Sequence, residues 1–118
     1  MTVPLVGGRW RRLPLGLAVV RGRSMEPTLV AGDRLLVRYG AAPRRGRLAV
    51  VRLPDGPDGP RPLSVKRLTR VEPDATWWVE SDNTDPALHG RVDSWQVGAL
   101  PRESVVALVL LRLPRRGR

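Results

Sequence analysis

The feature that most constrains the fold is the way Gly and Pro divide the chain into short apolar runs. Twelve Gly and twelve Pro are spread over 118 residues, which leaves little room for helices of ordinary length. Five runs of five to nine residues are rich in Val and Leu and are bounded by turn-forming residues: 34–38, 47–53, 63–71, 76–80 and 105–113. This spacing predicts a mainly β domain with an antiparallel sheet. Residues 54–62, which contain two Asp-Gly pairs among four Pro, are predicted to form an exposed hairpin loop.

Length and composition exclude several classes of protein. A chain of 118 residues has material for one domain with a modest core and is too short for a two-domain enzyme. The chain has no cysteine, so it has no disulfide, no thiolate zinc site and no cysteine nucleophile. The single histidine, His89, disfavours a His-based metal site or a Ser-His-Asp triad, and we expect it on the surface. We therefore expect neither a metal nor an organic cofactor.

The positive charge of the chain comes almost entirely from Arg, and the single lysine is the informative exception. A net charge of +10 suggests an acidic partner such as nucleic acid or a membrane surface. However, all but one of the 21 basic residues are Arg, a bias that a genome rich in G and C produces without any functional cause. Lys66 is the only lysine. A desolvated amine can lose its proton whereas a guanidinium cannot, so a position that needs a neutral amine accepts Lys and not Arg.

Three short segments carry groups suited to chemistry. The first is Gly-Arg-Ser-Met-Glu-Pro-Thr-Leu at residues 22–29, the second is Val-Lys-Arg-Leu at 65–68, and the third begins with Glu-Ser-Asp-Asn at 80–83 and continues to Asp-Ser at 93–94. Each segment alone has an ordinary structural interpretation. Ser24 fits a turn or a helix cap, Lys66 fits the edge of a strand, and the third segment fits a polar loop.

Taken together and in this order, the three segments resemble the type I signal peptidases and their relatives, which use a Ser-Lys dyad. The resemblance covers about residues 20–111 and implies a coiled antiparallel sheet or partial barrel of the signal peptidase and LexA-like type. It implies that Ser24 is the nucleophile, that the Ser24 backbone amide stabilises the oxyanion, and that Lys66 is the general base. The supporting and substrate-binding residues that it implies are Met25, Pro27, Ser81, Asp82, Asn83, Asp93 and Ser94.

The chemistry of these groups agrees with the resemblance. A serine hydroxyl becomes a good nucleophile when a nearby base removes its proton, and an amine can replace the usual imidazole. A free lysine has a pKa of about 10.4, and burial can lower it by roughly 3 to 5 units. The apolar neighbours Val65 and Leu68 favour such burial of Lys66. Arg67 is expected to be structural and to add to the lowering of the Lys66 pKa.

Several positions depart from the family pattern. Gly22 stands where many signal peptidases carry a second hydroxyl for the oxyanion. Arg91 replaces the serine that often orients the lysine, and Trp95 replaces an Arg that often pairs with the Asp. Ser81 and Ser94 are the alternatives for orienting Lys66. Three tryptophans, Trp77, Trp78 and Trp95, are expected in the core or along the substrate groove, with the core favoured.

The remaining expectations concern organisation and substrate. We expect a basic and apolar segment at residues 1–19, a catalytic domain at 20–113 and a basic tail at 114–118, with residues 1–12 and the tail frayed. The apolar stretches 13–20 and 105–111 are too short to span a membrane, which favours a cytoplasmic protein. Among soluble relatives, the nickel-type superoxide dismutase maturation proteases resemble the chain in size and in Ser-Met-x-Pro-Thr. This resemblance implies removal of a short N-terminal propeptide from the dismutase precursor, with nickel belonging to the substrate.

Three alternatives stay open. One is a signal peptidase-like enzyme that cleaves other, secretory precursors and contacts the membrane peripherally through basic residues 9–23. The second is a catalytically silent basic β domain that binds nucleic acid, although the absence of Phe and the scarcity of Tyr disfavour a base-stacking surface. The third is a LexA-like repressor that cleaves itself, although few residues precede Gly22 and no cleavage hinge is evident.

Overall fold

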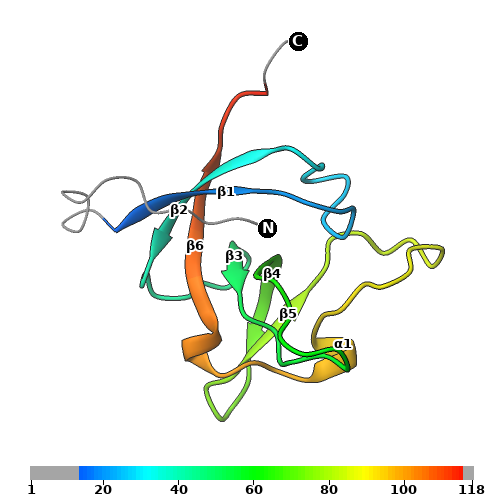
Figure 1. Cartoon of the computed structure of the whole chain (residues 1–118). Coiled ribbons are helices and arrows are strands. Elements are labelled where there is room, and N and C mark those ends of the chain that lie inside the picture. The colour runs from blue at the N-terminus through cyan, green and yellow to red at the C-terminus, as the bar shows by residue number, and fades with distance from the viewer. Residues whose placement is uncertain (1–13, 116–118) are drawn as a thin grey trace.

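The computed structural model describes residues 14–115, and within them six strands form one open antiparallel sheet (Figure 1). The strands are β1 (Leu15–Val19), β2 (Arg34–Tyr39), β3 (Leu48–Val51), β4 (Ser64–Val71), β5 (Trp77–Glu80) and β6 (Val105–Arg112). Their order across the sheet is β1-β2-β6-β3-β4-β5. A short helix α1 (Ser94–Val97) and a 3-10 turn η2 (Arg102–Ser104) lie between β5 and β6. The prediction of a mainly β, antiparallel fold is confirmed.

The five apolar runs of the sequence each contain one observed strand, but β1 was not predicted. Its residues lie in the apolar stretch 13–20, which contains Pro14 and Gly16. In the structure Gly16 and Ala18 face the interior, and Leu15, Leu17 and Val19 alternate with them, as a strand requires. Because β1 pairs with β2 along its whole length, the sheet begins before residue 20, where the sequence suggested the domain boundary.

The described part of the C-terminal tail is held against the sheet rather than frayed. The Pro114 carbonyl accepts a hydrogen bond from Arg34 Nη2 at 3.0 Å. Arg115 forms a two-point ion pair with buried Asp33, and this hydrogen bonding lowers the pKa of the Asp33 carboxyl. Residues 1–13 and 116–118, which include Arg9, Arg11 and Arg12, lie outside the described residues, and the expectations for them are untested.

The predicted hairpin loop is present, and the tryptophans divide between core and surface. Residues 54–62 form the connection between β3 and β4, and the backbones of Gly56 and Gly59 exchange two hydrogen bonds within it. Trp77 is buried in the core as expected, and Trp78 is half-buried. Trp95 is 67% exposed, so its placement in the core was wrong. It lies on α1, where its indole packs edge-to-face on Trp78 and donates to Glu80.

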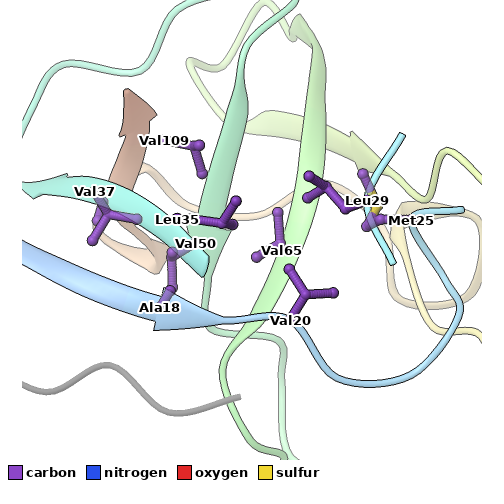
Figure 2. Close-up of a cluster of buried hydrophobic side chains, with 10 residues drawn as sticks. Ala18, Val20, Met25, Leu29, Leu35, Val37, Val50, Val65 and Val109 are labelled. Carbon is purple, nitrogen blue, oxygen red and sulfur yellow. The ribbon is translucent and has the colours of Figure 1, made fainter. Parts of the chain in front are cut away.

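Two clusters of buried side chains fill the interior. The first combines residues of β1, β2, β3, β4 and β6 with three residues of the segment that follows β1, and its members are Ala18, Val20, Met25, Leu29, Leu35, Val37, Val50, Val65, Ala107 and Val109. Figure 2 shows Met25 and Leu29 of this turn beside Val20 and Val65. The second cluster contains Leu68, Trp77 and Val79 near the β4–β5 edge. The first cluster therefore fixes the turn after β1 and the start of β4 relative to one another.

The fully buried Leu68 offers a test of the second cluster. We expect Leu68→Ala to lower the free energy of unfolding by about 2 to 5 kcal/mol, because it removes apolar contacts and leaves a cavity. Leu111→Ala is the matched control, since Leu111 is 48% exposed on β6 and its loss should change stability far less. Urea unfolding of both variants measures the difference. Equal losses would contradict the assigned core.

Candidate active site

Ser24 lies in the turn that follows β1. Two hydrogen bonds close this turn, from Glu26 N–H to the Arg23 carbonyl at 3.1 Å and from Leu29 N–H to the Met25 carbonyl at 2.9 Å. Gly22 precedes them with φ +77°, a left-handed conformation that favours glycine. Met25 is 2% exposed and anchors the turn in the core, while Pro27 is exposed on its outer side. Ser24 itself is only partly buried. The turn thus holds its hydroxyl next to the core in which Met25 is packed.

Lys66, the third residue of β4, brings its amine to Ser24. Lys66 Nζ lies 3.3 Å from Ser24 Oγ and 2.9 Å from Ser81 Oγ, although Ser24 is 42 positions away in the sequence. The register of β4 with β5 pairs Arg67 with Glu80, which places Ser81 next to Lys66. Of the two serines that the sequence offered for orienting the amine, the structure selects Ser81. The hydroxyl of Ser94 instead accepts a hydrogen bond from Val79 N–H at 2.8 Å.

The environment of Lys66 favours the neutral amine. The residue is 3% exposed, and its burial lowers the pKa from 10.5 to about 8. The negative charge of Asp93 acts in the opposite direction, and the positive charge of Arg91 adds to the lowering. The expectation that Arg67 supplies this positive charge was wrong, since the charges that act on Lys66 are those of Asp93 and Arg91.

Asp93 supports the site through hydrogen bonds to the backbone of Ser81 and of α1. One oxygen of its buried carboxylate accepts from Ser81 N–H at 3.0 Å, and the other accepts from Trp95 N–H at 3.0 Å. Asp93 is also the N-cap of α1, in a capping box with Gln96. The carboxylate therefore fixes the backbone of the residue that orients Lys66 and begins the helix that follows.

Asp82 and Asn83 join the third sequence segment to the Ser24 turn. Asn83 N–H donates to the Ser24 carbonyl at 2.9 Å, and its side-chain amide donates to the Arg23 carbonyl at 2.9 Å. Asp82 N–H contacts Met25 Sδ at 3.3 Å, and the carboxylate pairs with Arg67 at 2.6 Å. Burial acts to raise the pKa of Asp82, but hydrogen bonds from Arg67 and Thr28 outweigh it, so the pKa lies below its ordinary value. Arg67 is structural, as expected.

A groove of about 280 Å³ opens beside Ser24. Its walls come from the segment after β1 and from the segment that leads into β4, and its lining residues are Val20, Arg21, Gly22, Ser24, Met25, Pro62, Leu63, Ser64 and Val65. Strand β1 is an edge strand, and the first residues of β4 pair with β3 but lie outside the β4–β5 register. Among residues 14–115, the wall formed by the start of β4 therefore has a strand partner on one side only, which leaves its other edge for an extended peptide.

Three further features are the position of His89, groups of metal-ligand side chains, and membrane-spanning helices. His89 is exposed in the loop between Asn83 and α1. Within residues 14–115, no group of three or more His, Asp or Glu side chains is placed to hold a metal ion. None of the helices in this same part of the chain has the length and apolarity that crossing a membrane requires.

Because Lys66 is the only lysine, its titration can be observed directly. In protein labelled with ¹³C at the lysine ε-carbon, we expect a single side-chain NMR signal whose pH midpoint lies at about 8 in the folded state. The same signal in the urea-unfolded chain, the internal control, should return to a midpoint of about 10.4. A folded-state midpoint equal to the unfolded one would show that the amine is solvated and charged at neutral pH.

Comparison with known families gives the site its context. The model of the Peptidase S24-like family matches residues 11–91, more than half of the chain. The match includes Ser24, Lys66 and the Ser81–Asn83 segment, and it ends before Asp93. Comparison with curated proteins finds no matching relative. The family match and the open antiparallel sheet agree, and the chain belongs to the Peptidase S24-like family of serine peptidases.

Proposed function

We propose that the chain is a serine endopeptidase that uses Ser24 and Lys66 as a catalytic dyad to remove a short N-terminal propeptide from a precursor protein. The observation that carries the proposal is the approach of a buried amine, Lys66 Nζ, to within 3.3 Å of Ser24 Oγ. A buried lysine with a pKa of about 8 has a minor neutral fraction near pH 7, far larger than that of a free lysine, and becomes mostly neutral above pH 8.

The reaction follows from the positions of these groups. Neutral Lys66 accepts the Ser24 hydroxyl proton while it donates a hydrogen bond to Ser81, which directs its lone pair toward Ser24. Ser24 Oγ then forms a bond to the scissile carbonyl carbon, and the carbonyl becomes an oxyanion. The Lys66 ammonium returns the proton to the leaving amine as the C–N bond breaks. Water, deprotonated by the same amine, hydrolyses the acyl-enzyme and restores Ser24.

Backbone groups supply the oxyanion stabilisation in this proposal. Among the described residues, the Ser24 N–H makes no backbone hydrogen bond and is available to the oxyanion. Gly22 offers no hydroxyl there, so the site depends on main-chain donors. The Asn83 side-chain amide donates to the Arg23 carbonyl, which belongs to the same peptide unit as the Ser24 N–H, and so holds that unit in place.

The groove favours an extended peptide as substrate. Among residues 14–115, the first residues of β4 pair with β3 but not with β5, a geometry that can bind a peptide as an added strand. The buried side chains of Val20, Met25 and Val65 make its floor apolar, which suits small apolar side chains next to the scissile bond. Arg21 is the one charged residue that lines it among residues 14–115.

As the precursor we propose a nickel-type superoxide dismutase, processed in the cytoplasm. The support is the resemblance of the Ser-Met-x-Pro-Thr segment and of the chain length to the maturation proteases of that dismutase. Nickel would bind the product of the cleavage and not this protein. Secretory precursors are the alternative substrates.

Cleavage of the precursor tests this function. The wild-type chain, Ser24→Ala and Lys66→Ala are incubated with the dismutase precursor and, separately, with a set of secretory precursors. The new N-termini are identified by mass spectrometry. Ser104→Ala is the matched control, since this serine lies in η2, away from the lining of the groove.

Cleavage of the dismutase precursor by the wild type and Ser104→Ala alone is the expected result. If only secretory precursors are cleaved, the proposed dismutase substrate is contradicted, whereas the catalytic dyad is still supported. Activity that persists in Ser24→Ala, or no cleavage of any precursor, would contradict the enzyme assignment.

The orienting role of Ser81 gives a second kinetic prediction. We expect Ser81→Ala to lower kcat by roughly 10- to 100-fold with little change in KM, because the amine loses its alignment while the groove is intact. The wild-type rate should rise with pH through about 8, since deprotonation of Lys66 produces the active base. Exposed Thr84→Ala serves as the control. A Ser81→Ala enzyme with unchanged kcat would remove Ser81 from the mechanism.

A further inference from the structure

Arg91 is a charged residue close to the site that the proposed mechanism does not use. It lies in the loop between Asn83 and α1 and is half-buried. Its Nη1 donates to the Asn83 carbonyl at 2.6 Å. Asn83 in turn donates its N–H to the Ser24 carbonyl at 2.9 Å. One residue therefore separates the Arg91 guanidinium from the backbone of the nucleophile.

The charges around Lys66 come from few groups. Ser24 from the turn and Ser81 after β5 contact the amine and are neutral. On β3, the residue opposite Lys66 is Ala49. On β4 itself, Arg67 is paired with Asp82. Among residues 14–115, the charged groups that act on the amine are Asp93, from the start of α1, and Arg91.

Asp93 has a structural role in the site, although its negative charge opposes a neutral Lys66 amine. The buried carboxylate holds Ser81 N–H and caps α1, so it fixes the hydroxyl that orients Lys66. A buried carboxylate near an amine stabilises the ammonium form. The site thus contains a structural anion that acts against its own base, and a nearby cation of fixed charge would offset it.

We propose that Arg91 is a positioning residue of the Ser24–Lys66 site: it fixes Asn83 against the Ser24 turn, and its charge offsets that of Asp93 so that the Lys66 amine loses its proton more readily. This inference rests on the proposed function, because a neutral amine matters only if Lys66 acts as a base. In the family pattern, the serine that Arg91 replaces often orients the lysine. Here Arg91 contributes to this role through Asn83 and through its charge, without contact with the amine. Ser81 supplies the contact with the amine.

Two substitutions separate the charge of Arg91 from its hydrogen bond. Arg91→Gln keeps an amide donor for the Asn83 carbonyl and removes the charge, whereas Arg91→Lys keeps the charge and loses the planar donor. Arg38→Met is the control, since Arg38 is exposed on β2. Thermal unfolding establishes that each variant is folded. The midpoint of the lysine NMR signal then reports on Lys66 without requiring any cleavage. Arg91→Lys contains two lysines, and its Lys66 signal is the one that disappears when Lys66→Met is added.

We expect Arg91→Gln to raise the Lys66 midpoint by about one pH unit, because Asp93 is then unopposed. Arg91→Lys and Arg38→Met should leave the midpoint near that of the wild type. On a cleaved precursor, Arg91→Gln should lower kcat about tenfold near pH 7, with KM unchanged, and regain it toward pH 9.

A Lys66 midpoint in Arg91→Gln equal to that in Arg38→Met would overturn the inference. If Arg91→Gln is not folded, Arg91→Met replaces it and is judged by the same midpoint. A wild-type chain that cleaves nothing would contradict the proposed function, while the NMR midpoints would still decide the role of Arg91.

Discussion

The burial of one amine between two hydroxyl groups is the interaction on which the rest of the site depends. Lys66 is 3% exposed, and its Nζ contacts Ser24 and Ser81. Burying an ammonium is costly, so the folded protein favours the neutral form and lowers the pKa to about 8. A surface lysine would have the same reach, but at neutral pH it would be almost entirely protonated and could not accept the Ser24 proton. The chemistry therefore follows from the packing of β4 against its neighbours.

The sheet order explains how distant segments meet around this amine. β4 lies between β3 and β5, so Ser81, directly after β5, falls beside Lys66. The Ser24 turn arrives from the other end of the sheet and is fixed by Met25 and Leu29, which share one cluster with Val65 of β4 (Figure 2). Asn83 then joins the turn to the segment after β5. Core packing and two hydrogen bonds from Asn83, one from its backbone and one from its side chain, thus hold the nucleophile and the base together.

Much of the fold could be predicted from the sequence because the strands are short, rich in Val and Leu, and separated by Gly and Pro. β1 escaped this reasoning, since Gly16 weakens a strand locally and the pairing of β1 with β2 is a long-range property. Ser24 and Lys66 were singled out by resemblance and residue chemistry. The choice of Ser81 over Ser94 depends on the β4–β5 register, and the exposure of Trp95 depends on the cap that Asp93 gives to α1. Neither can be derived from local composition.

The reactivity of Ser24 is the property that tests this account most directly. The wild type and Lys66→Met are treated with a serine-reactive phosphonate that carries a short alanyl peptide, and the adduct is mapped by mass spectrometry between pH 6 and 10. The account predicts one adduct, on Ser24, that forms faster as the pH passes about 8 and is nearly lost in Lys66→Met. Equal labelling of both proteins, or labelling away from Ser24, would contradict it.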